Sequence, residues 1–177
     1  MASKPTSKRR KAPSENGRCA KIFIDGAARG NPGPAGAGIV IAPAGSRKLS
    51  EFFFYLGETT NNVAETEALI LALQEALKRG EKQVEVCTDS ELLANQVNGV
   101  YRVRDKNLQS LHVLVRNLTE AFDCFSIRHV PREENRHADK LANRAVNEGL
   151  KKQLRPVPQA RQFERTPSED SQQPTFW

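Results

Sequence analysis

The chain has 177 residues, of which 38% are hydrophobic and 27% are charged, so it can form one domain with a hydrophobic core and differs from a wholly disordered protein. No apolar run approaches the roughly 18 residues that cross a bilayer, and no apolar stretch of about 7 to 15 residues follows the basic N-terminus. We therefore expect no membrane association and no secretion, which predicts a cytoplasmic protein.

The net charge of +6 is spread unevenly along the chain. Residues 1–18 carry six Lys and Arg against one acid, residues 19–150 carry sixteen against seventeen, and residues 151–177 carry five against three. We expect a nearly neutral folded domain over 19–150, a basic disordered tail over 1–18 and a disordered C-terminal tail over 151–177. The first tail could attract an anionic partner, although its KRRK run (8–11) also fits a nuclear-import patch.

The first part of the domain has the pattern of three strands. Residues 20–25 (AKIFID) have the β-branched and aromatic content of a strand that is buried on both faces. A Gly- and Pro-rich turn follows over 26–38, and further strands are predicted near 38–42 and 49–56. These consecutive strands predict an antiparallel meander.

Helices and strands then alternate. Residues 62–79 have a helical pattern with an apolar stripe at Leu69, Leu73 and Leu77, and Gly80 is a natural stop. The order predicts an α/β fold with a five-stranded mixed sheet, its first three strands antiparallel, flanked by helices. The remaining predicted elements are strands over 83–87 and 123–130, and helices just after Asp89, over 107–121 and over 133–147.

Two acids stand where packing alone does not favour them. Asp25 ends an apolar strand, in which Asp is disfavoured, although it could cap the turn that begins at Gly26. Glu65 precedes Leu69 and Leu73 by four and eight residues, so it shares the buried stripe of its helix. It could instead be a first-turn acid that the helix dipole stabilises by about 0.3 to 1 kcal/mol, but unpartnered burial would cost several times more. A bound cation would resolve that conflict.

Asp89 and Asp139 are less distinctive. Asp89 closes a strand within Thr88-Asp89-Ser90, and the carboxyl ends of strands commonly carry ligands in α/β sheets. It could equally be the N-cap of the helix that follows. Asp139 flanks the apolar face of the last helix, three residues before Ala142, where an ordinary exposed acid is an alternative interpretation.

These four acids lie on separate elements but can converge if the strands are neighbours. Carboxylates that lie close together repel one another unless cations are bound or some of the acids take up protons. Oxygen ligands favour Mg²⁺ or Mn²⁺ over zinc. The sequence therefore predicts a divalent-metal site at Asp25, Glu65, Asp89 and Asp139.

Four ordered motifs over about residues 20–148 resemble the ribonuclease H family. They are DGAARGNPGP from Asp25, TTNN from Thr59 leading to Glu65, Thr88-Asp89-Ser90, and NRHADKLA with Asp139, ten residues after His129. The resemblance implies a ribonuclease H-like fold and an endonuclease that cuts the RNA strand of RNA/DNA hybrids, leaving 5′-phosphate and 3′-hydroxyl ends. We expect such an enzyme to be a monomer.

The resemblance also implies a role for each acid. Asp25 bridges two Mg²⁺ ions, for which Mn²⁺ can substitute, Glu65 and Asp89 complete the leaving-group side, and Asp139 helps to hold the ion that activates water. His129 suits proton transfer or product release, although a packed or surface histidine at a strand end is the alternative.

The implied substrate contacts are backbone amides and short polar groups, which suit the 2′-hydroxyl and the groove shape of a hybrid. An ordinary pair of helix-capping residues is the alternative for Asn61 and Asn62. The implied contacts are Gly26, Ala27, Asn31, Thr60, Asn61 and Asn62.

Some features depart from the best-known bacterial pattern. The connection after Asp89 lacks the additional basic, Trp-containing helix with which some members grip substrate. Arg102, Arg104 and Lys106 could partly replace it, or they could belong to a solvated loop. Glu91 stands where a substrate-contacting Gln often occurs, and His129-Val130-Pro131 replaces a glycine-rich loop.

Two other functions fit part of the pattern. A transposase- or integrase-like nuclease would share the broad fold but act on DNA, and the Asn61-Asn62 pair and the DGxxxxNPGP turn favour hybrid cleavage instead. A non-catalytic nucleic-acid-binding module would gain nothing from four carboxylates beside phosphates.

Overall fold

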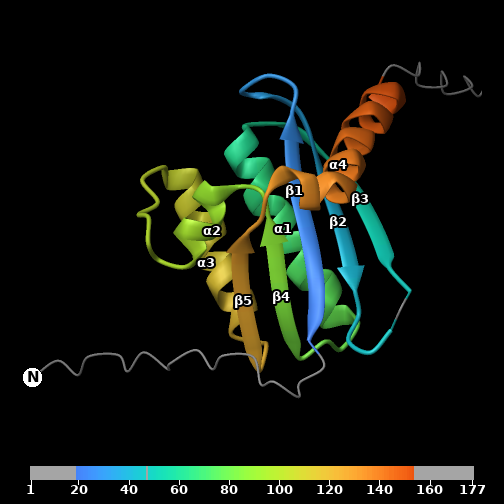
Figure 1. Cartoon of the computed structure of the whole chain (residues 1–177). Coiled ribbons are helices and arrows are strands. Elements are labelled where there is room, and N and C mark those ends of the chain that lie inside the picture. Colours follow the sequence, from blue (N-terminus) through green and yellow to red (C-terminus); the bar gives the residue numbers. More distant parts are fainter. Residues whose placement is uncertain (1–18, 47, 154–177) are drawn as a thin grey trace, which may run out of the picture.

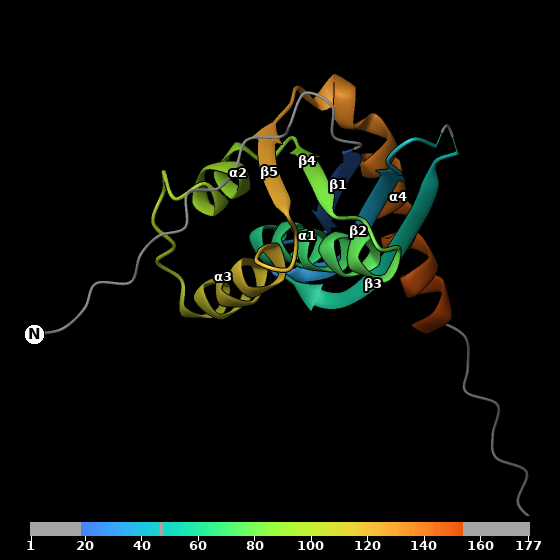
Figure 2. The ribbon, with the colours of Figure 1, turned by 90° about the horizontal axis from the view of Figure 1, so that it is seen from below.

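The computed structural model describes residues 19–46 and 48–153. Its elements, in chain order, are β1 (Ala20–Ala28), β2 (Gly33–Ala42), β3 (Ser50–Thr59), α1 (Asn61–Lys78), β4 (Gln83–Thr88), α2 (Glu91–Val97), α3 (Lys106–Thr119), β5 (Cys124–His129) and α4 (Arg132–Gln153). The strands form one sheet in the order β3-β2-β1-β4-β5 (Figure 1). Figure 2 shows α1 and α3 against one face of this sheet and α4 against the other.

The strand directions gather several chain segments at one edge of the sheet. β1 pairs with β2 and β2 with β3 in antiparallel fashion, whereas β4 pairs with β1 and β5 with β4 in parallel fashion. The mixed sheet with three antiparallel first strands is therefore confirmed. β1, β4 and β5 end at the same edge, here called the upper edge because it lies at the top of Figure 1. α1 begins at the upper edge too, because β3 runs parallel to β1.

The hydrophobic core fixes α1 against the sheet. Ile22 and Ile24 of β1 and Leu69 and Leu73 of α1 are fully buried in one cluster. Each such side chain contributes about 1.5–3 kcal/mol relative to exposure, so α1 is held firmly in this orientation. The expectation that β1 is buried on both faces was wrong for its first half. Its residues Lys21 and Phe23 are only half-buried.

Glycines in β2 allow α4 to lie directly on the sheet. A Cβ at Gly38 would collide with the carbonyl oxygen of Ala138 and the amide nitrogen of Ala142. A Cβ at Gly36 would lie 2.6 Å from the Cβ of Ala145. Only glycine fits at these two positions. The close contact between β2 and α4 fixes where the residues next to Ala138 lie relative to β1 and β2.

Two boundaries differ most from those predicted. β2 begins at Gly33 instead of near Gly38, because Gly36 and Gly38 are strand residues that pack against α4, and Gly33 lies against the backbone of Arg29 so that only a short turn follows β1. α4 continues to Gln153, past the predicted end at residue 147, since Gly149 lies inside the helix against the ring of Tyr55. Both predicted tails otherwise lie outside the described residues.

Within the described ranges, no helix is long and apolar enough to cross a membrane.

Candidate active site

Asp25 and Asp89 are neighbours at the place where two parallel strands part. The ladder between β1 and β4 ends at the pair of Ile24 and Thr88, and each acid is the next residue of its chain segment. Asp25 is only 6% exposed and still pairs with Gly38 of β2 on its other side. Asp89 is half-buried. Two carboxylates thus lie close together at the upper edge.

Local capping does not explain these acids. Asp25 lies within β1 and not in a turn. The N-cap of α2 is Ser90, whose Oγ accepts a hydrogen bond from the amide of Leu93 at 3.3 Å, so Asp89 has no capping role. Turn or helix capping therefore does not account for the carboxylate of either acid.

Glu65 reaches the same edge from α1. A Cβ at Gly26 would collide with the backbone of Ala64 and Glu65, so the start of α1 lies directly against β1 beside Asp25. Glu65 is 7% exposed, and its buried Oε2 has no hydrogen-bond partner. An unpartnered buried carboxylate oxygen is unfavourable, which points to a ligand that this arrangement is built to receive.

Asp139 is supplied by α4. The side chain of Asp139 is 28% exposed, and its Oδ1 accepts a hydrogen bond at 3.2 Å from the guanidinium of Arg132, whose own side chain is 75% exposed. Because the neighbouring Ala138 packs on Gly38, Asp139 is held beside β1. An exposed ion pair of this kind contributes little to stability and can rearrange when a ligand binds.

The four acids influence one another electrostatically. Burial, together with the charges of Asp89 and Asp139, raises the pKa of Asp25 to about 7, and the nearby Arg132 offsets only part of this increase. Burial raises the pKa of Glu65 to about 9, with smaller contributions from Asp25 and Asp89. The structure therefore brings the four predicted acids into one electrostatic unit, and without a cation the raised pKa values favour a protonated Glu65 and a partly protonated Asp25 at neutral pH.

The donor set fits a hard divalent cation. It consists of carboxylate oxygens, one of them buried and unpartnered at Glu65, and such oxygens suit Mg²⁺ or Mn²⁺. Among the residues described, however, no three His, Cys, Asp or Glu side chains already surround one point closely enough to coordinate an ion. Mg²⁺ usually binds through one or two carboxylates and keeps several waters, so its binding does not require three acids around one point.

His129 lies at the same edge, one strand further along. It is the last residue of β5 and the register partner of Thr88, the residue before Asp89. Its side chain is exposed. The packed-histidine alternative does not apply, because the imidazole is exposed to solvent.

The predicted substrate contacts divide into buried and exposed residues. Asn31, in the turn after β1, accepts a hydrogen bond through Oδ1 from the amide of Asn61 at 3.3 Å, so this turn and the start of α1 form one surface. Asn31, Asn61 and Asn62 are exposed, Ala27 is half-buried, and Gly26 is buried beneath α1. Thr60 is the N-cap of α1, so Asn61 and Asn62 are not needed as caps.

One residue at the site was missed in the sequence. Asn135 of α4 is fully buried, and its Nδ2 donates to the carbonyl oxygen of Ile24 at 2.9 Å and to Oδ1 of Asp89 at 2.7 Å. Its position was readable, because Asn135 precedes Ala138 and Ala142 by three and seven residues and so shares the buried stripe of α4. The same stripe criterion had singled out Glu65.

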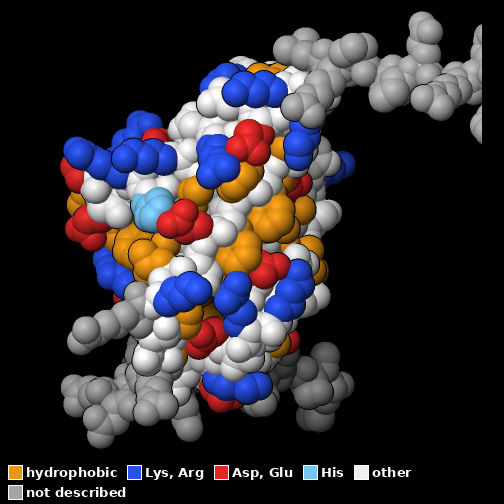
Figure 3. Space-filling model, turned by 90° about the vertical axis from the view of Figure 1, so that its right-hand side faces the viewer, with side chains coloured by type: hydrophobic (Ala, Val, Ile, Leu, Met, Phe, Trp, Pro, Cys, Tyr) orange, Lys and Arg blue, Asp and Glu red, His pale blue; other side chains and the backbone are white. Residues whose placement is uncertain are grey.

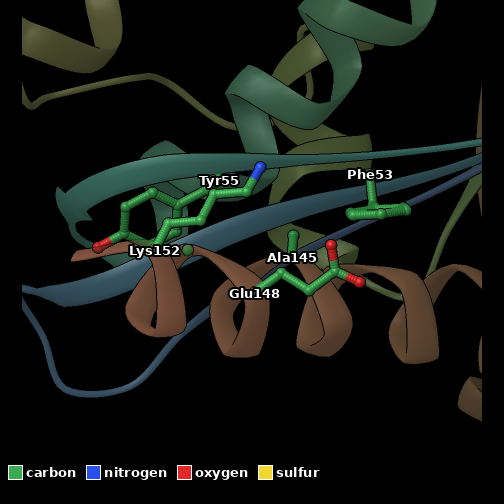
Figure 4. Close-up of a pocket in the computed structure, with 6 residues that line it drawn as sticks. Phe53, Tyr55, Ala145, Glu148 and Lys152 are labelled. Carbon is green, nitrogen blue, oxygen red and sulfur yellow. The ribbon is translucent and has the colours of Figure 1, made fainter. Parts of the chain in front are cut away.

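A groove lies on another part of the surface. Phe53 and Tyr55 of β3 face Ala145, Glu148 and Lys152 of α4 across a groove (Figure 4). The guanidinium of Arg144 lies over the ring of Phe53, 4.4 Å from its centroid. Figure 3 shows hydrophobic side chains mixed with Lys and Arg on this side of the molecule. None of the four acids lines this groove, so it is separate from the candidate active site.

Comparison with known proteins gives consistent matches. A family model described as reverse transcriptase-like matches residues 23–145. The chain is 41% identical over 136 residues to ribonuclease HI of Halobacterium salinarum, covering 77% of this chain and 68% of that protein. It is also 41% identical over 127 residues to a bifunctional protein of Mycobacterium tuberculosis, covering 71% of this chain but only 35% of that protein.

A solved structure gives a similar result. The protein in the crystal structure of LC11-RNase H1 in complex with RNA/DNA hybrid is 42% identical in sequence to this chain. The two structures superpose with a TM-score of 0.70, covering 74% of this chain and 99% of that chain. The segment matched by the family model contains all four acids, His129 and Asn135.

Proposed function

The chain belongs to the ribonuclease H family, and we propose that it is an endonuclease that hydrolyses the RNA strand of RNA/DNA hybrids with the help of two divalent metal ions. The observation that carries the proposal is the group of four acids at the upper edge, with Glu65 buried and unpartnered beside Asp25. The related LC11-RNase H1, which was crystallised with an RNA/DNA hybrid, supports the choice of substrate.

Each acid has a distinct part in the proposed reaction. When bound, two divalent ions lower the pKa of the attacking water and neutralise charge on the leaving oxygen. Asp25 would bind both ions, because it lies between Asp89 on one strand and the acids of two helices. Glu65 and Asp89 would hold the ion on the leaving-group side, and Asp139 would help to hold the other. The products would carry 5′-phosphate and 3′-hydroxyl ends.

His129 would move a proton at the edge of this site. Its imidazole is exposed at the end of β5, beside the segment that carries Asp89. A histidine is suited to proton transfer near neutral pH, so His129 could accept or deliver a proton as water attacks or product leaves.

Recognition of the hybrid would use the surface beside the acids. Asn31, Asn61 and Asn62 are exposed there, and their amide groups can donate to and accept from ribose hydroxyls in a shallow groove. Ala27 and the N-cap Thr60 border the same surface, whereas the buried Gly26 would act by letting α1 approach β1. Such contacts read sugar and groove shape more than base sequence.

The decisive experiment is cleavage of a labelled RNA/DNA hybrid with Mg²⁺ and with EDTA. We expect cleavage of the RNA strand with Mg²⁺ only, and Asp25→Asn should reduce it to below about 1% of the wild-type rate while the circular dichroism spectrum is unchanged. Asp123→Asn, the same substitution at an exposed acid just before β5, is the matched control and should remain active. Near-normal turnover by Asp25→Asn would contradict the metal site.

Duplex DNA of the same sequence separates the alternative nuclease from a ribonuclease H. Cleavage of duplex DNA at a rate similar to that of the hybrid would favour the transposase- or integrase-like function. We also propose that the enzyme acts as a monomer in the cytoplasm, which sedimentation and cell fractionation would test.

A further inference from the structure

Asn135 links the first part of α4 to the two strands that carry Asp25 and Asp89. Asn135 contacts the Ile24 carbonyl, which can only accept hydrogen bonds, and the Asp89 carboxylate, which can only accept them when it is ionised. The amide nitrogen must therefore face them, and the orientation of the side chain is fixed by chemistry. The opposite atom, Oδ1, is buried and has no hydrogen-bond partner.

The position of this amide explains why the link matters. The ladder between β1 and β4 ends at Ile24 and Thr88, and one residue later each strand presents an acid. Nδ2 of Asn135 sits between the separating strands and bonds to both at 2.9 Å and 2.7 Å. The buried side-chain amide of Asn135 thus sets the spacing between the two strands at the positions of Asp25 and Asp89.

Stability alone would not select asparagine here. Burying an amide oxygen without a partner is unfavourable, and a hydrophobic side chain would avoid that loss at this fully buried position of α4. The two hydrogen bonds that Nδ2 donates to the strand ends offset this loss, and one of them goes to Asp89, an acid of the site.

We propose that Asn135 is a positioning residue, which holds Oδ1 of Asp89 in place so that the other oxygen of this carboxylate faces the metal site. The inference rests on the proposed metal-dependent function. In the absence of the amide, Asp89 could rotate away from Asp25, since the two like charges repel one another. Asn135 therefore keeps the two acids ready for a cation, so that little rearrangement is needed when the cation binds.

The test is the affinity of the free protein for Mn²⁺, measured by calorimetry without substrate. Asn135→Ala removes both hydrogen bonds, and Asn135→Asp keeps the shape but replaces the donor with an acceptor. We expect both to weaken Mn²⁺ binding by about 10- to 100-fold and to raise the Mg²⁺ concentration needed for half-maximal cleavage, as for other residues that orient metal ligands.

Asn98→Ala is the matched control. Asn98 also donates its Nδ2 to a strand carbonyl, that of Ile127 at 3.1 Å, but contacts no acid of the site. The Asn98→Ala variant should lose some thermal stability in EDTA and keep the wild-type affinity for Mn²⁺. If the Asn135 variants likewise lost stability but bound Mn²⁺ within twofold of wild type, the positioning role would be overturned.

A measurement on the wild-type protein covers the case in which the Asn135 variants do not fold. The side-chain amide signals of Asn135 should shift during an NMR titration with Mg²⁺, because their acceptor Asp89 becomes a ligand. Signals that stay fixed at saturating Mg²⁺ would overturn the inference. Failure of the proposed function looks different: Mn²⁺ binding would still depend on Asn135, but the wild-type enzyme would not cleave hybrid.

Discussion

The amide nitrogen of Glu65 lies so close to Gly26 that no side chain fits between them. This contact lets the start of α1 rest on β1 and brings the Glu65 carboxylate beside Asp25. Gly26→Ala should therefore push α1 away from the strand, which reduces both Mg²⁺ affinity and hybrid cleavage and destabilises the protein by about 1–3 kcal/mol. Calorimetric titration with Mg²⁺ and thermal unfolding would measure the two effects.

Gly80→Ala separates these effects. Gly80 has a φ of +74°, and a Cβ there would meet nothing within 4 Å, so alanine adds only backbone strain of about 1 kcal/mol. Its stability should fall while its Mg²⁺ affinity stays normal. A Gly26→Ala enzyme with wild-type Mg²⁺ affinity would show that the close approach does not position Glu65.

Local patterns in the sequence were sufficient to predict the sheet and much of the site. The apolar stripe of α1 placed Glu65 on the buried face, and the order of strands and helices predicted the mixed sheet. Whether Asp25, Glu65, Asp89 and Asp139 come together depends on which strands are neighbours, so the residue pattern made their convergence conditional and the family resemblance supported it. That information lies in long-range pairing and not in local periodicity.

The features that were missed have physical reasons. The glycines at 33, 36 and 38 looked like a loop because glycine is common in turns, yet in β2 their lack of a side chain makes room for the turn after β1 and for α4. Asn135 was not singled out in the sequence, although its spacing to Ala138 and Ala142 places it on the buried stripe of α4. Its role depends on the gap between β1 and β4, which no pattern within α4 reveals.

The loop after α2 should contact the phosphates of the hybrid. Arg102 and Arg104 are exposed there, next to the exposed ring of Tyr101. α2 has seven residues and begins just after Asp89, so the loop lies within about 10–15 Å of that acid along the helix. Combined alanine substitution of Arg102 and Arg104 should raise KM several-fold and leave kcat nearly unchanged. It should also weaken the salt dependence of binding, because about one to two fewer counterions are released when the hybrid binds.

Lys78→Ala provides the control for this loop. Lys78 is an exposed cation at the last turn of α1, at the end of the helix that is far from the upper edge, and it pairs with Glu75. Its removal should not change the salt dependence. If the salt dependence of the double arginine variant were unchanged, Arg102 and Arg104 would not be contacting the phosphates of the hybrid.

Residues 1–18, which lie outside the described residues, carry six Lys and Arg against one acid. Deleting them should weaken hybrid binding and flatten its dependence on salt, because released counterions account for much of the affinity of basic segments. The rate constant of cleavage at saturating hybrid should not change, since all predicted site residues lie after this segment. If fluorescence anisotropy gave the same salt dependence for the full-length and shortened proteins, the segment would not be contacting phosphates.

Without metal, the buried acids should make the protein less stable as pH rises. In the unfolded chain Glu65 loses its proton near its ordinary pKa of 4.5, whereas in the folded protein it keeps the proton up to about pH 9. Between these values the folded state binds more protons, so stability falls with rising pH. Asp25 adds to the same trend between its ordinary pKa of 3.8 and about 7.

Glu65→Gln imitates the protonated acid and should remove the larger part of this trend. In EDTA at pH 8 the variant should be more stable than wild type by an amount on the order of a few kcal/mol, and the difference should shrink towards pH 4.5. Glu75→Gln makes the same change on the same helix, at an acid paired with Lys78, and should show no such gain. Adding Mg²⁺ should stabilise wild type more than Glu65→Gln, because binding to the folded state shifts the equilibrium. A stability difference between Glu65→Gln and wild type that stayed constant from pH 5 to pH 9 in EDTA would mean that Glu65 is already ionised in the folded protein and paired by some other group.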